Sequence, residues 1–178
     1  MRILNEKIKT PEEIKEISKN MKKQEKTIIT TNGGFDILHY AHINLLNKAK
    51  TQGDVLIVLL NSDSSIKKFK GENRPIIPQQ ERALMLSALE CVDYVTIFDE
   101  DTPLNLLKII KPNKHIKGGS FIPERIEEEQ KLLSSFGGKF KNFELEEGFS
   151  TTNIIKKILE NREKPSNPST DYLKEIKS

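Results

Sequence analysis

Short apolar runs bounded by polar residues divide this 178-residue chain into alternating predicted strands and helices. Residues 27–31 ("TIITT") are β-branched, and residues 54–61 ("DVLIVLLN") form an apolar run typical of a parallel strand covered on both faces. Further strands are predicted at 93–98, 114–119 and 139–145. Strands separated by helical segments at this spacing indicate βαβ units.

Helical patterns occupy the segments between these strands. One helix is predicted to begin at Pro11, and a second, of about a dozen residues, to end near Gly53. A short helix is predicted within 62–75, and others over 78–90, 102–111, 123–138 and 150–160. In the helix over 78–90, an apolar stripe is expected to face the core, formed by Ala83, Leu84, Leu86 and Leu89. We therefore expect an α/β fold, a Rossmann-like three-layer sandwich with a mostly parallel five-stranded sheet. Its expected parts are an N-terminal edge helix (1–26), one domain (27–161) and a polar C-terminal tail (162–178).

Two histidines, His39 and His42, follow the first predicted strand and Gly33-Gly34. On a helix, residues three apart share a face, and a helix N-terminus after a glycine loop favours an anion. Two imidazoles there could donate hydrogen bonds to a phosphate whose charge grows during reaction. A metal site is disfavoured, because helical metal-binding histidines are usually four apart with a nearby acid. Two packed histidines without a chemical role are the other alternative.

Further candidates follow other strands, at the sheet edge where ligands bind in such folds. A basic cluster surrounds Gly71, and Gly118 and Gly119 permit close approach of a ligand. Hydroxyls before the last helix suit either helix caps or phosphates. The cluster consists of Lys67, Lys68, Lys70 and Arg74, and the hydroxyls belong to Ser150, Thr151 and Thr152. A solvated loop is the alternative for the basic cluster.

Composition narrows the possible partners. The net charge of +3 is weak for a nucleic-acid binder, so a small anionic ligand is the better expectation. One cysteine, Cys91, and three histidines make a zinc site improbable and fit a cytoplasmic location. No apolar run approaches the roughly 20 residues that span a bilayer, and the N-terminus lacks the apolar core of a signal peptide. We therefore expect no membrane partner.

The segment "GGFDILHYAHINLL" (33–46) resembles the His-x-Gly-His signature of the nucleotidyltransferase superfamily of cytidylyl- and adenylyltransferases. Ala41 stands where that signature has glycine, and its methyl group is expected to crowd the phosphates. "NSDSSIKKFKGENRPIIPQQER" (61–82), "LSALECVDYVTIFDEDTP" (86–103), "IKGG" (116–119) and "STTNIIKKI" (150–158) follow in order. Over roughly residues 10 to 160 the chain resembles the heptose-1-phosphate adenylyltransferases.

This resemblance implies AMP transfer from ATP to heptose 1-phosphate, giving ADP-heptose for lipopolysaccharide or related glycans, and pyrophosphate. It implies Mg²⁺ carried by the nucleotide, no separate metal site, and a homo-oligomer, dimeric or larger. Many bacterial members are fused to a sugar kinase, and the chain resembles the stand-alone form. The resemblance implies catalytic roles for His39, His42 and Lys70. The implied nucleotide-binding residues are Thr31, Asn32, Gly33, Gly34, Phe35, Asp36, Asn61, Arg82, Lys117, Gly118, Gly119, Ser150, Thr151 and Thr152.

Two other functions remain open at this point. One is a cytidylyltransferase for glycerol 3-phosphate or another polyol phosphate, which residues 35–46 alone suit equally well. The other is a non-catalytic nucleotide-binding regulatory module, which the departures at Ala41 and at Ser120, where the family has aspartate, would permit. A class I aminoacyl-tRNA synthetase has a related histidine motif, but this chain is too short and too weakly basic for tRNA recognition.

Overall fold

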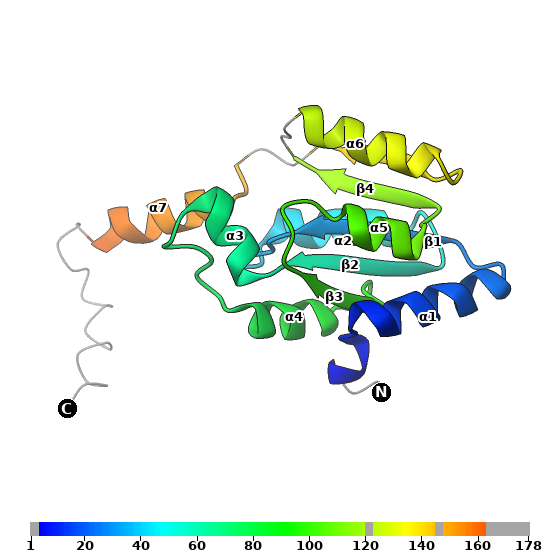
Figure 1. The fold of residues 1–178 in the computed structure, drawn as a ribbon. Helices are drawn as coiled ribbons and strands as arrows, with labels where there is room; N and C mark the ends of the chain where they lie inside the picture. The colour runs from blue at the N-terminus through cyan, green and yellow to red at the C-terminus, as the bar shows by residue number, and fades with distance from the viewer. Residues whose placement is uncertain (1–3, 120–122, 145–147, 163–178) are drawn as a thin grey trace.

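A five-stranded, entirely parallel sheet with strand order β3-β2-β1-β4-β5 forms the centre of the computed structural model, which describes residues 4–119, 123–144 and 148–162 (Figure 1). The strands are β1 (Ile28–Gly33), β2 (Val55–Asn61), β3 (Tyr94–Phe98), β4 (Lys114–Gly118) and β5 (Lys139–Phe143). The helices are η1 (Leu4–Lys7), α1 (Pro11–Lys23), α2 (Tyr40–Lys50), α3 (Asp63–Lys70), α4 (Gln79–Ser87), α5 (Leu104–Ile110), α6 (Pro123–Ser134) and α7 (Thr151–Arg162). The predicted α/β fold is confirmed.

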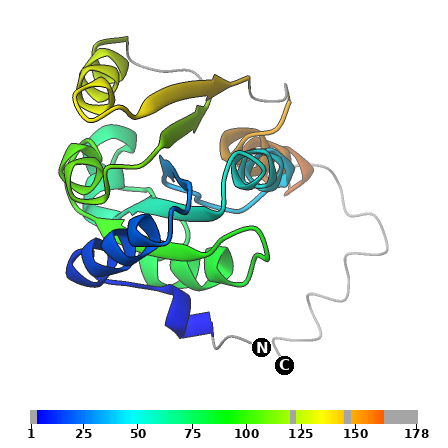
Figure 2. The same cartoon turned by 90° about the vertical axis from the view of Figure 1, so that its right-hand side faces the viewer.

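Helices cover both faces of the sheet, as expected for three layers (Figures 1 and 2). On one face Leu46 of α2 and Leu86 of α4 are fully buried against β1 and β2. On the other face Ile14 of α1 and Leu107 of α5 are fully buried against the same strands. Each such side chain contributes about 1.5–3 kcal/mol to folding. Because β2 has helices on both sides, all seven of its residues are buried, which explains its continuous apolar run.

One expectation for the helix over 78–90 is wrong. Leu84, expected in the core, is 38% exposed, whereas Arg82 is fully buried beside Ala83 and Leu86. The stripe of α4 that faces the sheet therefore begins at an arginine. A buried guanidinium is tolerated only when its donors are paired, and those of Arg82 are, as described below.

Some expectations cannot be compared with the structure. Residues 163–178 of the predicted tail, and Ser120, lie outside the described residues. The proposed division of the chain at residues 26 and 161 stays a prediction. Among the described residues, no helix combines the length and the apolar character that crossing a bilayer requires.

Candidate active site

A cleft of about 220 Å³ lies at the carboxyl edge of the sheet, and we call it the histidine cleft. Its walls come from the loop after β1, the start of α2, the end of α3, the end of β4 and the start of α7. It is lined by Asn32, Gly33, Gly34, Phe35, Asp36, His39, His42, Leu45, Lys70, Gly118, Phe149, Ser150, Thr151 and Thr152. The predicted catalytic residues and most predicted nucleotide-binding residues are thus brought together.

The remaining predicted residues lie around this cleft. Thr31 is fully buried in β1 directly before the lining residues. Asn61 and Lys117 line a second cleft beside the first. Gly119 follows β4 with a φ of 113°, a backbone conformation that favours glycine. Arg82 lines neither of these clefts.

The rings of His39 and His42 are stacked, with centroids 3.8 Å apart and an angle of 21° between their planes. His39 is the N-cap residue of α2, and its side chain makes no capping hydrogen bond, although the amide of His42 in the first turn donates to the carbonyl of His39 at 3.0 Å. The Nδ1 atoms of both rings are buried, and no described residue hydrogen-bonds to them. These two atoms are shielded from solvent, so in this conformation they are not accessible to a ligand in the cleft.

Burial lowers the pKa of His39 and lowers the pKa of His42 to about 4. The charges of His39 and Lys70 depress the pKa of His42 further, and Asp36 opposes them weakly. Both rings are therefore neutral near pH 7 without a ligand. A bound polyphosphate would reverse this effect, because its negative charge favours the imidazolium form. The histidine pair can thus stabilise negative charge that develops on a phosphate during the reaction.

Asp36 joins three segments of the site. Its buried carboxylate accepts hydrogen bonds from Nη1 of Arg74 at 2.8 Å and from the backbone amides of Ile76 and Ile77 at 3.0 Å. Its backbone carbonyl accepts the hydroxyl of Thr151 at the start of α7. The loop after β1, the loop after α3 and the start of α7 are therefore held together by one residue.

Lys70, the last residue of α3, is the member of the predicted basic cluster that lines the histidine cleft. Partial desolvation there lowers its pKa, and nearby Arg74 adds to the effect. Lys67 and Lys68 instead form surface ion pairs with Glu72 and Asp101 at 3.7 and 3.5 Å. In the basic cluster, Lys70 therefore lines the cleft and Arg74 holds the loop to Asp36, whereas Lys67 and Lys68 lie at the surface.

Arg82 stabilises the loop after β1 through hydrogen bonds made inside the protein. Its guanidinium donates to the carbonyl of Gly34, to the carbonyls of Asn61 and Ile77 at 2.9 and 2.8 Å, and to Oδ1 of Asp63 at 2.7 Å. Since the side chain is fully buried, it makes no contact with the cleft in this conformation. Contact with nucleotide phosphates, which the resemblance implies, would require these hydrogen bonds to break.

The hydroxyls before α7 divide between two tasks. Ser150 accepts the amide of Asn153 and caps the helix, so the capping alternative is confirmed for this residue. Thr151 is tied to Asp36, and Thr152 is exposed at the mouth of the cleft. Ala41 lies in the first turn of α2, is 2% exposed and does not line the cleft. Its methyl group therefore forms no part of the cleft wall, and the expected crowding of the phosphates stays a prediction.

A second cleft of about 190 Å³ shares Asn32, Gly33 and Gly34 with the histidine cleft. Its other lining residues are Asn61, Phe69, Asp101, Thr102, Pro103, Lys117 and Glu129. The ammonium of Lys117 contacts the buried carboxylate of Glu129 at 2.6 Å. Glu129 was not identified from the sequence, because it lies in a run of acidic residues with no distinguishing signal.

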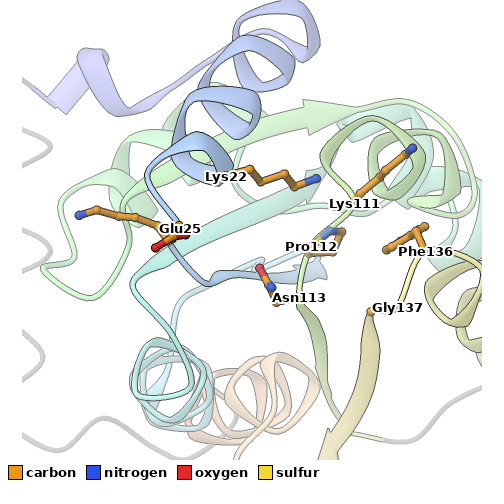
Figure 3. A pocket seen from close by; sticks show the side chains of 9 residues that line it. Lys22, Glu25, Lys111, Pro112, Asn113, Phe136 and Gly137 are labelled. Atoms are coloured by element: carbon orange, nitrogen blue, oxygen red, sulfur yellow. The ribbon is translucent and has the colours of Figure 1, made fainter.

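A larger cavity, about 350 Å³, lies at the opposite end of the sheet (Figure 3). Its wall includes Lys22 of α1, whose ammonium donates to the carbonyl of Ile110 at 2.7 Å, and Asn113, which accepts the amide of Ile28 at 2.8 Å. These polar groups are thus engaged with backbone atoms. None of the predicted site residues lies there, and ligands of open parallel sheets bind at the carboxyl edge.

The parallel sheet, the helix N-termini and the histidine pair at its carboxyl edge define an α/β protein of the class that binds nucleotide phosphates. The Cytidylyltransferase-like family matches residues 30–157, and the chain belongs to this family.

Similar proteins include "Bifunctional protein HldE" of Syntrophotalea carbinolica, 45% identical over 157 residues, which are 88% of this chain and 32% of that protein. The protein of the same name from Geobacter metallireducens is 48% identical over 153 residues, 86% of this chain and 31% of that protein. The chain therefore spans about a third of the length of these relatives.

Solved structures agree on the fold. A lipopolysaccharide core biosynthesis protein from Thermoplasma volcanium is 26% identical with a TM-score of 0.56, covering 68% of this chain and 97% of its own. A pantoate-beta-alanine ligase from Francisella tularensis, complexed with beta-gamma ATP and beta-alanine, is 18% identical with a TM-score of 0.59 and covers 90% of this chain and 81% of its own. The second likeness shows the fold alone.

Proposed function

We propose that the chain is a nucleotidyltransferase that transfers AMP from ATP to heptose 1-phosphate in the cytoplasm, for lipopolysaccharide or related glycan precursors. The observation that carries the proposal is the stacked His39–His42 pair beside Lys70 in a chain of the Cytidylyltransferase-like family. An oxygen of the sugar phosphate attacks the α-phosphorus, a new P–O bond forms, and the bond to the β-phosphate breaks. The electron pair leaves with pyrophosphate.

Catalysis in this proposal rests on positioning and charge stabilisation, without a side-chain nucleophile. His39 and His42 donate hydrogen bonds to the phosphates, and Lys70 brings a positive charge to the transition state. The first turns of α2 and α7 supply backbone amides. Mg²⁺ enters as part of the nucleotide substrate, Mg·ATP.

The sugar phosphate would occupy the second cleft. Asn61, Asp101 and Thr102 offer the hydrogen-bonding groups that sugar hydroxyls need, and the shared segment Asn32–Gly34 brings the two substrates together. The base would lie near Gly118, at the end of β4. An assembly of two or more copies stays a prediction, which sedimentation velocity would check.

Pyrophosphate release from each pairing of ATP or CTP with heptose 1-phosphate or glycerol 3-phosphate tests the proposal. We expect release with ATP and heptose 1-phosphate, and a loss of about 100-fold in kcat for His42→Ala, as for other groups that stabilise developing charge. Release only with CTP and a polyol phosphate would establish the cytidylyltransferase alternative. ATP binding without release from any pairing would favour a regulatory module.

A further inference from the structure

His115 is fully buried in β4, and both of its ring nitrogens have partners on β1. Nδ1 lies 2.8 Å from the hydroxyl of Thr30, and Nε2 lies 3.2 Å from Oδ1 of Asn32. The register explains this arrangement, because His115 pairs directly with Thr30, and residues two apart in a strand point to the same face. A buried residue of the sheet thus contacts a residue that lines both clefts.

Glu129 of α6 determines which nitrogen of His115 carries the hydrogen. Its Oε2 lies 3.7 Å from Nε2, and its other oxygen is paired with Lys117. A lone pair on Nε2 would face this carboxylate, so the N–H belongs on Nε2 and Nδ1 accepts the hydroxyl hydrogen of Thr30. Complete burial lowers the pKa of His115 to about 3, which keeps the ring neutral and preserves this tautomer.

The orientation of His115 fixes that of Asn32. Because Nε2–H donates to Oδ1, the amide group Nδ2 of Asn32 is directed away from His115. Asn32 lies on the face of β1 that carries Ile28, the face covered by α5, and Lys117 and Glu129 of the second cleft lie close to His115 on this side. Among the described residues, none accepts a hydrogen bond from Nδ2. A donor is therefore available where the two clefts meet.

We propose that His115 is a positioning residue that holds the Asn32 carboxamide so that Nδ2 donates to the phosphate of the acceptor sugar phosphate. This inference rests on the proposed function, since the attacking oxygen must reach the α-phosphorus at the junction of the clefts. Asn32 touches the attacking phosphate group, and His115 acts through Asn32 alone. Neutral donors suit this task, because a full positive charge would weaken the attacking oxygen.

Two variants of His115 separate positioning from general stability. In His115→Gln the side-chain amide reaches the place of Nε2 and can still donate to Asn32. In His115→Asn the shorter side chain reaches only the place of Nδ1, so the contact with Thr30 survives and the contact with Asn32 is lost. Both place a neutral amide in the same pocket, which makes each the control for the folding of the other.

We expect His115→Asn to lower kcat/KM for heptose 1-phosphate about tenfold or more, as misplaced reacting groups do. His115→Gln should lose less than about threefold, and the affinity for α,β-methylene-ATP should change less than about twofold in both. Asn32→Ala should lower kcat/KM for heptose 1-phosphate about 100-fold, and the double variant with His115→Asn should show no further decrease. The proposal would be overturned if His115→Asn lowered kcat/KM by the same factor in Asn32→Ala as in the wild-type protein. It would also be overturned if His115→Asn weakened nucleotide affinity as much as it lowered kcat/KM.

The Asn32 side-chain amide signals in a ¹⁵N correlation spectrum provide a readout that needs no turnover. They are identified by their absence in Asn32→Ala. We expect them to shift in His115→Asn and to stay near their wild-type positions in His115→Gln. Unshifted signals in His115→Asn would refute the positioning role. If the wild-type chain releases no pyrophosphate with any acceptor, the proposed function fails, and this spectrum still decides whether His115 orients Asn32.

Discussion

Arg74 donates a 2.8 Å hydrogen bond to the carboxylate of Asp36, which is only 3% exposed. Two backbone amides of the loop between α3 and α4 also donate to this carboxylate, so Asp36 fixes the position of that loop. The residues on both sides of Asp36, Phe35 and Ile37, have positive φ values of 46° and 52°. Such conformations cost energy in non-glycine residues, and the hydrogen bonds of Asp36 offset that cost.

We predict that Asp36→Asn destabilises the protein by about 2–3 kcal/mol, because a charge-assisted acceptor of several bonds is lost. Catalysis should fall as well, because Lys70 precedes the loop that Asp36 holds. Urea unfolding and pyrophosphate release measure the two effects.

Asp93→Asn is the matched control for Asp36→Asn. Asp93 also accepts from a basic side chain, Lys50 at 2.6 Å, and from a backbone amide, that of Leu56, but it lies before β3 at the opposite end of the sheet. The Asp93→Asn variant should be less stable than the wild-type protein and should retain its kcat. An equal loss of kcat in both variants would refute the positional role of Asp36.

Arg82 provides a second prediction. Arg82→Met removes donors from the carbonyls of Gly34 and Asn61 and leaves Asp63 without its ion-pair partner. Each buried carbonyl left without its donor costs about 1–3 kcal/mol, so we expect a large loss of stability in urea, whereas Asp63, whose side chain is 36% exposed, can be solvated by water. Arg82→Lys should recover only part of it, because an ammonium cannot replace the planar fork of guanidinium donors. Wild-type stability combined with lost ATP affinity would instead indicate direct contact with phosphate.

The success and the limits of prediction from sequence have physical causes. The strands and helices could be predicted because β2 must be apolar when it is covered on both faces, and helices must follow parallel strands. The order of glycines, His39 and His42 after β1 placed the histidine cleft. Arg82 could not be distinguished from a surface residue, since its partners Gly34 and Asn61 lie 48 and 21 positions away. The pairing of His115 with Asn32 across 83 positions likewise depends on strand order.

Ala41→Gly tests the departure from the family motif. Because the methyl group of Ala41 is buried and does not line the histidine cleft, its removal should not improve nucleotide binding. Glycine in a helix costs about 1 kcal/mol relative to alanine, so the variant should be less stable by about this amount. Calorimetric ATP affinity should stay within about twofold of wild type. Clearly tighter binding would show that the methyl group does restrict the phosphates.

Lys70→Met should lower kcat by about 100-fold while the fold stays intact, because the ammonium at the cleft stabilises transition-state charge. Lys67→Met removes the same charge from the same helix, but Lys67 points to Glu72 at the surface. That exposed pair contributes little, so kcat should change by less than about twofold. Steady-state pyrophosphate release distinguishes the two. Similar losses would mean that the net charge of α3, rather than the place of Lys70, matters.

The buried imidazoles predict how stability depends on pH. The folded-state pKa values of His42 and His115 are lowered to about 4 and about 3, below the value of about 6.5 for an exposed histidine. As the pH falls from 7 to 5, the unfolded chain binds protons that the folded protein excludes, so stability decreases. Each group contributes at most about 1.4 kcal/mol per pH unit. Urea unfolding at several pH values should show a shallower decrease for His42→Gln than for wild type. Parallel curves would mean that His42 binds protons in the folded protein as readily as in the unfolded chain, and burial would then not lower its pKa.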